Sequence, residues 1–226
     1  LAHELRTPIQ NLMGEAQVAL SRPRTAEEYH QILESSLEEY DRLSRMINGL
    51  LFLARADNPS TAIMRERFDA RRELDIVADY YDAEADEQGV TMSCEGQAWL
   101  DADPTLFRRA LTNLLSNALR HTHSGGQVRL AVRALEAGEV HVEVSDTGCG
   151  MAREHLEHLG TRFYRPDRTD CLPGDGVGLG LTIVKSIMAL HGGSVTIDSA
   201  EGRGMSVTLR FPPSRSSLTE DALAEG

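Results

Sequence analysis

The sequence is poor in cysteine, in aromatic residues and in long apolar runs. Its three cysteines are too widely spaced to indicate a metal site or a disulfide framework, and they fit a reducing compartment. No apolar stretch approaches the length of a membrane span, and no signal peptide is visible. Lys and Arg number 23 against 35 Asp and Glu, and the formal charge of -12 repels nucleic acid and anionic lipid. The composition therefore argues against nucleic acid as a partner.

The chain contains enough hydrophobic residues to form a buried core. Its 226 residues, 41% of them hydrophobic, suffice for one large domain or two modest ones. The chain begins at Leu1, without Met and already in a helical pattern. We therefore interpret it as a fragment, and we expect any sensing or membrane-anchoring segment to lie upstream.

Two helices are predicted at the start of the chain, over about 1–20 and 26–56. Apolar residues recur every three or four positions in both, which is typical of amphipathic helices. Pro8 follows residues that already look helical, so a kink is expected there. The break at 21–25 ends on Thr25, a good helix N-cap. The second helix carries a coiled-coil-like seam that a single hairpin cannot bury, so we expect a homodimeric four-helix bundle.

The rest of the chain mixes helical and extended patterns after a linker at 57–61 that contains Asn-Pro. Because strands and helices do not alternate strictly, we expect an α+β sandwich with helices on one face of a mostly antiparallel sheet. The tail after Pro213 is expected to be disordered. Helices are predicted over 70–88, 104–121, 152–160 and 178–191, and strands over 90–95, 97–103, 127–135, 140–146, 194–199 and 205–211.

Two polar patterns in this second part suggest a site for a phosphorylated ligand. Asn113 and Asn117 lie one helical turn apart, and their amide oxygens suit a hydrated Mg²⁺ that already carries phosphate oxygens. Alone, two amides on a polar helix face are equally well explained as solvated side chains. Asp146 follows a strand and precedes Gly148 and Gly150, which let a ligand approach the backbone. An Asp at such a turn can accept a hydrogen bond from an exocyclic amine such as that of adenine, although Asp-Gly turns are common.

A third pattern is rich in glycine and reads GDGVGLGL from Gly174 to Leu181. Backbone N–H groups at the start of a helix that begins near Leu179 make an anion cradle suited to phosphates. The run is not a Walker loop, because no Gly-Lys-Ser/Thr follows, and no strand leads into it as a dinucleotide fingerprint requires. A lone glycine run is weak evidence, so the order of the three patterns matters more.

Taken in order, the patterns resemble the nucleotide-binding domain of the histidine kinases. Asn-x₃-Asn, Asp-x-Gly-x-Gly, a loop, Gly-x-Gly-x-Gly and finally 202–204 (Gly-x-Gly) follow the order of that family. The opening HELRTP resembles the family's phosphoacceptor box, and RFYR at 162–165 resembles its aromatic box. The resemblance runs from Leu1 to about Pro212. More narrowly, LAHELRTPIQNLMGEAQVALSR and SLEEYDRLSRMINGLLFLARADN are similar to the heavy-metal (copper/silver) sensor kinases.

The resemblance implies a fold and a set of functional residues. The fold is an all-α helical hairpin, dimeric as a four-helix bundle, followed by an α+β sandwich of the histidine-kinase, topoisomerase and chaperone ATPase type. His3 takes the γ-phosphoryl group of ATP with Glu4 as its acid–base partner, and Thr7 orients water for dephosphorylation of the partner protein. Asn117 ligates Mg²⁺ and Asp146 binds adenine. The other nucleotide-binding residues implied are Asn113, Arg120, His121, Gly148, Gly150, Arg162, Phe163, Gly176, Gly178, Leu179 and Gly180.

Elementary chemistry agrees with these roles. An imidazole with an ordinary pKa of about 6.5 is largely neutral at pH 7 and loses one proton as it attacks phosphorus. An adjacent carboxylate can orient the ring and take that proton. The chain departs from the family at Val177 and Met205, where a hydroxyl residue is usual. At Val177 we expect a modest weakening of nucleotide binding at most, because the backbone donors remain.

The resemblance also implies partners and a cellular location. The hairpin forms a homodimer, and the phosphoryl group passes to an aspartate of a response regulator receiver domain, with phosphatase activity as well. The chain would be the cytoplasmic portion of an inner-membrane sensor protein, reaching the membrane only through upstream segments. Residues 1–60 would form the dimerisation and phosphotransfer domain, 61–213 the catalytic ATP-binding domain and 214–226 a disordered tail.

Two other functions stay open at this point. ATPases of type II topoisomerases and heat-shock chaperones share the nucleotide fold, but they have a water-activating Glu where this chain has Asn113. A scaffold that binds nucleotide without phosphate transfer is the second alternative, and the His-Glu pair on a helix argues against it. His155 and His158 are spaced to share a metal, although such a site needs a third ligand.

Overall fold

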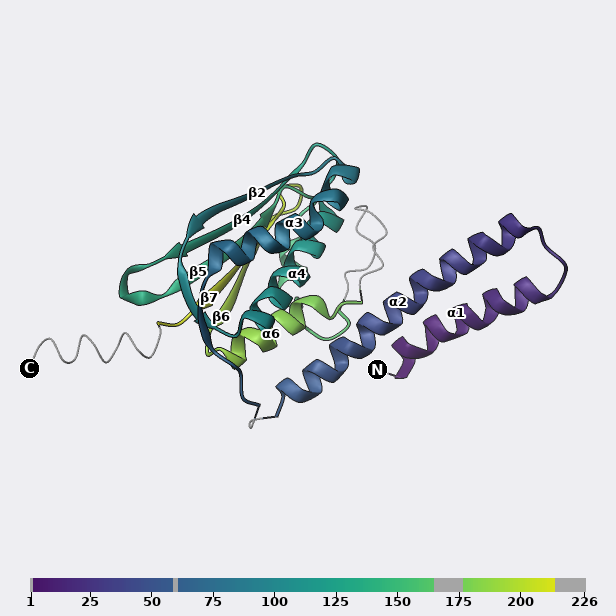
Figure 1. Ribbon diagram of the computed structural model, residues 1–226, viewed down its shortest axis with the longest axis horizontal. Coiled ribbons are helices and arrows are strands. Elements are labelled where there is room, and N and C mark those ends of the chain that lie inside the picture. Colours follow the sequence, from purple (N-terminus) through teal and green to yellow (C-terminus); the bar gives the residue numbers. More distant parts are fainter. Residues whose placement is uncertain (1, 59–60, 165–176, 214–226) are drawn as a thin grey trace, which may run out of the picture. The chain divides into compact units, whose positions relative to one another are not determined.

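The computed structural model describes residues 2–58, 61–164 and 177–213, and the side chains of these except at 2–4 and 137. The chain divides into two compact units, Leu1–Phe52 and Leu53–Gly226 (Figure 1). The predicted tail, 214–226, lies outside the described residues. Among the helices formed by residues that the structure describes, none is both long and apolar enough to cross a membrane.

The first unit consists of α1 (Ala2–Leu20) and all but the last turn of α2 (Ala26–Ala56), and both helices were predicted. Glu15 on α1 ties the two together, because its carboxylate accepts hydrogen bonds from Ser35 (3.1 Å) and Ser36 (3.4 Å) on α2. Pro8 is buried inside α1, and the kink expected there stays a prediction.

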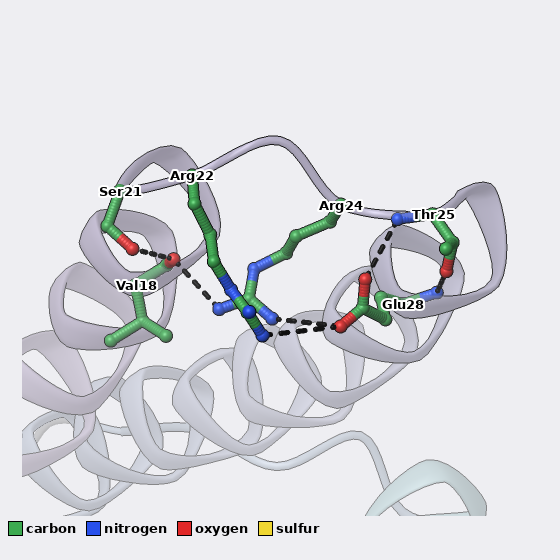
Figure 2. A network of polar contacts seen from close by, with 6 residues as sticks. All are labelled: Val18, Ser21, Arg22, Arg24, Thr25 and Glu28. Atoms are coloured by element: carbon green, nitrogen blue, oxygen red, sulfur yellow. Dashed lines mark hydrogen bonds and ion pairs between the residues drawn. The ribbon is translucent and has the colours of Figure 1, made fainter.

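Polar contacts at the turn stop one helix and start the next (Figure 2). Thr25 Oγ1 accepts a hydrogen bond from the Glu28 N–H (3.2 Å), and Glu28 Oε2 accepts one from the Thr25 N–H (2.8 Å). This reciprocal capping box confirms Thr25 as the N-cap of α2. On the other side of the turn, the Val18 carbonyl accepts from Ser21 Oγ (2.8 Å) and from Arg24 Nη2 (3.0 Å). Arg24 also lies 3.5 Å from Glu28, so one side chain links the end of α1 to the start of α2.

Large apolar side chains of the hairpin remain exposed in the chain taken by itself. Five of them on α2 are separated by four, three, seven and four residues, so they form a single stripe along the helix. Each is at least 47% exposed. We call this set the apolar stripe. It consists of Leu33, Leu37, Tyr40, Ile47 and Leu51.

The second unit is built on a five-stranded sheet of order β2-β4-β5-β7-β6. The outer pair β2 and β4 is parallel, whereas the other three pairs are antiparallel, which confirms the mostly antiparallel sheet. The two predicted hairpins, β4–β5 and β6–β7, are present. The five strands are β2 (Thr91–Gln97), β4 (Gln127–Ala134), β5 (Val140–Asp146), β6 (Ser194–Ser199) and β7 (Met205–Phe211).

A second, two-stranded sheet pairs β1 (Glu66–Asp69) with β3 (Trp99–Ala102) in antiparallel register. Sequence patterns did not predict β1, and the stretch predicted as a strand over 97–103 is divided between β2 and β3. A short 3₁₀ turn, η1 (Glu136–Gly138), joins β4 to β5.

Three helices cover one face of the large sheet: α3 (Ala70–Gln88), α4 (Pro104–His121) and α6 (Gly180–Leu190) (Figure 1). Their bounds agree closely with the predicted ones. The helix predicted over 152–160 is shorter, because only α5 (Arg153–Leu156) is helical and turns follow it. Its N-cap, Ala152, carries no side chain that can cap the first turn.

Local sequence explains where α4 begins. Asp103 is its N-cap, and Asp103 Oδ1 accepts hydrogen bonds from the N–H groups of Thr105 and Leu106, both at 3.0 Å. Pro104 occupies the first turn, as predicted. The helix packs against α3 partly through the buried carboxylate of Glu73, which pairs with the Arg108 guanidinium.

A fully buried histidine joins the end of α6 to the beginning of α4. His191 Nε2 accepts a hydrogen bond from the Asp103 N–H (3.0 Å), and Nδ1 donates one to the Ile187 carbonyl (2.7 Å). The two bonds together require the neutral imidazole with its proton on Nδ1. The ring also packs edge-to-face on Phe211, with centroids 5.5 Å apart.

Candidate functional site

The proposed phosphoacceptor residues belong to α1. His3 and Glu4 are the second and third residues of that helix, and their side chains lie outside the described residues. Thr7 is exposed one helical turn after His3. The remaining predicted site residues all belong to the second unit.

Asn113 faces the start of α6. Its side-chain Nδ2 donates to the Arg109 carbonyl (2.7 Å), which orients the amide. Its Oδ1 points toward Gly180, where a Cβ would lie 3.3 Å from that oxygen. Asn117 follows one turn later on the same side of α4 and is exposed. The structure thus brings the Asn-x₃-Asn pattern and the end of the glycine run together.

Asp146, the last residue of β5, holds its own loop in place. Asp146 Oδ1 accepts hydrogen bonds from the N–H groups of Gly148 (2.9 Å) and Met205 (3.2 Å). Within the described part of the chain both bonds go to the same oxygen, so Oδ2 stays available to a ligand. Partial burial raises the pKa of the Asp146 carboxyl above its ordinary 3.8, and the two N–H donors partly oppose this shift.

Backbone crowding explains the two glycines after Asp146. A Cβ at Gly148 would lie 2.1 Å from the carbonyl oxygen of His121, at the end of α4. Gly150 has a φ of 61°, and a Cβ there would lie 2.0 Å from the Ala200 carbonyl oxygen. The loop is thereby pressed between α4 and the turn before β7. Any side chain at either position would displace one of them.

The end of the glycine run forms the first turn of α6. Gly178 has a φ of 69°, and its carbonyl accepts a hydrogen bond from the Phe163 N–H (3.0 Å). Leu179 is buried and is the N-cap of α6, and Gly180 is the first helical residue. Gly176 lies outside the described residues. The exposed N–H groups of this first turn give the positive end of a helix dipole, which suits an anion.

The other predicted residues lie at the edges of this arrangement. Arg120 and His121 are half-buried in the last turn of α4, where the His121 carbonyl accepts from the Cys149 N–H (3.2 Å). Arg162 is exposed and Phe163 is half-buried, next to Gly178.

Two segments of the chain match known domain families. Residues 1–59 match the His Kinase A (phospho-acceptor) domain, and residues 102–215 match the histidine kinase-, DNA gyrase B- and HSP90-like ATPase family. The chain belongs to the sensor histidine kinases. A similar relative, the sensor protein IrlS of Burkholderia pseudomallei (strain K96243), is 45% identical over 212 residues, covering 94% of this chain and 46% of IrlS. This histidine kinase chain therefore spans about half the length of the curated relatives it matches.

Solved structures agree with the fold of the histidine kinase chain. Full-length ShkA in complex with AMPPNP aligns with a TM-score of 0.72 and 28% identity, covering 94% of this chain and 44% of ShkA. The histidine kinase ThkA in complex with the response regulator protein TrrA aligns with a TM-score of 0.74 and 18% identity, covering 94% of this chain and 60% of ThkA. The predicted fold class is confirmed, with ATP as the nucleotide of the matched ATPase family.

The residues of the kinase site fit a magnesium ion that arrives with its nucleotide. Among the residues that the structure describes, no three His, Cys, Asp or Glu side chains gather as a metal site. The exposed amide of Asn117 can add one neutral oxygen to an ion already held by phosphates, and Mg²⁺ is commonly bound with so few protein ligands.

Sequence reasoning missed several polar contacts that frame this kinase site. Thr182 Oγ1 donates to the Gly160 carbonyl (3.0 Å), and Lys185 Nζ donates to the Leu159 carbonyl. Tyr164 bonds to His155, which had been considered only as a metal ligand. Of these residues only Tyr164 belongs to a recognised motif, the RFYR of 162–165, and no sequence pattern indicated its partner or the other two contacts.

Proposed function

We propose that this chain is the cytoplasmic catalytic core of a sensor histidine kinase that uses ATP to phosphorylate His3. The phosphoryl group then passes to an aspartate of a response regulator, and the core also removes phosphate from that partner. The observation that carries the proposal is that α4 is contacted at Asn113 by the start of α6 and at His121 by the loop after Asp146, in a chain whose α1 bears His-Glu.

In this proposal the second unit holds the nucleotide at both ends. Asp146 Oδ2 accepts a hydrogen bond from the adenine amine, because Oδ1 is already occupied by two backbone donors. The N–H groups of Gly178 and Gly180 face the phosphates at the helix terminus. Asn117 would help to hold a magnesium ion brought by the nucleotide, and that ion would supply charge neutralisation on the transferred group.

At the first unit, the imidazole of His3 forms a P–N bond to the γ-phosphorus as the bond to the bridging oxygen breaks and ADP leaves. Glu4 takes the ring proton. For dephosphorylation of the response regulator, Thr7 can orient water. It is exposed on the same side of α1 as His3, one turn away. Autophosphorylation therefore needs a nucleotide site and a histidine that lie on different units.

The hairpin supports the two proposed protein partners. The apolar stripe is exposed in the single chain. A second copy of the hairpin would bury it in a four-helix bundle. A groove of about 460 Å³ between the helices begins two turns after His3, close enough for a receiver domain whose aspartate must reach that residue. The groove is lined by Asn11, Gly14, Glu15, Val18, Arg24 and Ile32.

A heavy-metal (copper/silver) response of the whole protein is also part of this proposal. Its support is the detailed likeness of the two hairpin segments to heavy-metal sensor kinases, together with relatives that are named sensor proteins. The metal-sensing step and inner-membrane attachment would belong to segments other than these 226 residues.

Labelling with [γ-³²P]ATP tests the function. The parent chain should acquire an acid-labile, alkali-stable label, and His3→Gln should acquire none while still binding ATP. His30→Gln removes an exposed histidine from α2 and should keep the label. Steady ATP hydrolysis by His3→Gln at the parent rate would instead identify a topoisomerase-type ATPase. Nucleotide binding by the parent without any label would identify a scaffold.

A further inference from the structure

A histidine–tyrosine pair lies outside the residues assigned to the reaction. His155 on α5 and Tyr164 are both half-buried, and His155 Nδ1 lies 2.8 Å from Tyr164 Oη. The His158 ring packs on the same tyrosine with centroids 5.2 Å apart. The pair therefore fixes Tyr164 from α5, nine residues earlier in the chain.

Tyr164 follows a residue with an unusual backbone. Phe163 has a φ of 64° and is the one non-glycine residue of the described chain with a positive φ. This left-handed conformation is unfavourable for a bulky side chain, so surrounding contacts must maintain it. The Tyr164 N–H donates to the Thr161 carbonyl (3.1 Å), and the tyrosine ring is held by the histidines.

The conformation of Phe163 has a direct consequence for the nucleotide site. Its N–H donates to the Gly178 carbonyl (3.0 Å), and a Cβ on Gly178 would lie 3.0 Å from the Phe163 Cα. Gly178 in turn leads into the first turn of α6, where Asn113 faces Gly180. The position of Phe163 thus sets the position of the backbone donors assigned to the phosphates.

A second set of contacts holds the same segment on α6 but does not reach Phe163. Thr182 donates to the Gly160 carbonyl and Lys185 to the Leu159 carbonyl. These bonds fix the segment before Thr161. After that residue the described side-chain bonds are the ion pair of the exposed Arg162 with Asp57 and the His155–Tyr164 contact, which adjoins Phe163 on its C-terminal side.

We propose that His155 is a positioning residue for nucleotide binding, acting through Tyr164 on Phe163 and Gly178. This role rests on the proposed kinase function. In this role the imidazole acts through its position alone, and either neutral tautomer serves because the tyrosine hydroxyl can donate to Nδ1 or accept from it. Loss of the contact makes the backbone N–H groups that bind the phosphates less well ordered. ATP binding is then weaker, while the reaction at His3 is unchanged.

Steady-state kinetics of the labelled reaction provide the first test. Tyr164→Phe, which removes only the hydroxyl, and His155→Ala should each raise the KM for ATP about tenfold while changing kcat less than about twofold. The double variant should resemble the single ones, because both remove one contact. His155→Asn, which can again bond to the hydroxyl, should recover most of the loss. Tyr80→Phe makes the same change at a tyrosine that is 80% exposed, and it should match the parent.

Hydrogen exchange of the nucleotide-free chain provides a second test that needs no activity. Amides of Phe163 and Tyr164 should exchange about tenfold faster in Tyr164→Phe and His155→Ala, while amides of α4 keep their rates. An unchanged KM, or faster exchange throughout the second unit, would overturn the positioning role. If the parent chain does not bind ATP, both the kinase function and the positioning role of His155 are wrong. If the parent binds ATP but the variants behave like it, only the positioning role is wrong.

Discussion

At the scale of the residue, Asp146 divides its work between fold and ligand. One carboxylate oxygen accepts hydrogen bonds from two backbone N–H groups that belong to different segments, and in the proposed site the other oxygen would bind the nucleotide. Replacing the carboxylate with an amide separates the two roles, because Asn retains one acceptor oxygen and presents an NH₂ group where the second oxygen was.

Asp146→Asn should therefore weaken ATP binding without unfolding the loop. A hydrogen bond to a charged group contributes about 1.5–3 kcal/mol, so titration calorimetry should show a Kd roughly ten- to a hundredfold higher. Unfolding free energy should change by less than about 0.5 kcal/mol.

Because burial raises the pKa of Asp146, the affinity of the parent for ATP should fall as the pH is lowered toward that pKa, and the affinity of the variant should not. Asp198→Asn, at an exposed position of β6, is the matched control. Equal affinities of the two variants would contradict the assignment.

His191 makes the stability of the second unit depend on pH. Burial lowers its pKa below the ordinary 6.5, and the Ile187 carbonyl opposes the shift. The charged groups facing the ring are Arg65, Asp103 and Asp101. As the pH falls below 6.5 the unfolded chain binds a proton that the folded chain does not, so stability decreases until the folded pKa is reached.

Urea unfolding at several pH values between 5 and 8 checks this linkage. His191→Gln should be about 1–3 kcal/mol less stable at pH 7.5, because a buried hydrogen bond to Asp103 or Ile187 is lost. It should also lose stability less steeply below pH 6.5 than the parent does. His123→Gln, at an exposed position, should keep the parent's slope. A slope in His191→Gln identical to the parent's would refute the role of this imidazole.

The sequence predicted the individual site residues better than their contacts. Asn113, Asp146 and the glycines could be proposed from the sequence because a phosphate, a metal ion and an adenine ring require particular groups in a particular order. The bond from Met205 to Asp146 and the bond from Tyr164 to His155 depend on how distant turns pack. The first contact uses a backbone N–H group, which carries no sequence signal. The second joins two side chains that meet only because of the turns after α5, so neither contact could be read from residue types.

At the scale of the element, the turn between α1 and α2 shows how local sequence stops one helix and starts another. Thr25 and Glu28 exchange hydrogen bonds, and the Thr25 N–H holds the pKa of the Glu28 carboxyl below its ordinary 4.5. Arg24 is only 13% exposed in its side chain and links Val18 to Glu28 across the turn (Figure 2).

Thr25→Ala should weaken the start of α2 because the first turn loses its side-chain acceptor. Loss of such a cap costs about 1 kcal/mol. Hydrogen exchange of the first-turn amides of α2 should rise about fivefold in the full chain, which corresponds to that energy. Ser44→Ala removes a hydroxyl from the exposed middle of the same helix and should leave these amides unchanged. Identical exchange in the two variants would show that the cap contributes nothing.

Helices and hairpins were predictable because their signals are local. Hydrophobic periodicity and N-caps gave the bounds of α1, α2 and α4, and alternating residues separated by turns gave β4–β5 and β6–β7. The four residues of β1 pair with β3 residues that lie thirty or more positions away, and the parallel pairing of β2 with β4 crosses a whole helix. Such pairings depend on the assembled fold rather than on neighbouring residues.

At the scale of the whole molecule, the two units divide the proposed reaction between them. The first carries the histidine and the apolar stripe, and the second carries the nucleotide site. An apolar stripe on one helix gives a seam of the kind that joins helices in bundles, so assembly should depend on it.

Leu37→Glu should weaken the homodimer because it places a charge in that seam. Sedimentation measured over a range of concentrations should show a dimer Kd higher by about a hundredfold or more. Leu135→Glu makes the same substitution at an exposed leucine just after β4, outside the α1–α2 hairpin, and should leave the Kd unchanged. A dimer equally stable in both variants would place the interface elsewhere.

In the proposed site, the arrangement around Asp146 would also select the base of the nucleotide. A free carboxylate oxygen attracts the 6-amino group of adenine, but it repels the 6-oxo group of guanine or hypoxanthine, since two lone pairs would then face each other. Because the first oxygen is fixed by Gly148 and Met205, the carboxylate cannot rotate away to relieve that repulsion without breaking its own loop. The proposed site should thus accept ATP and reject GTP.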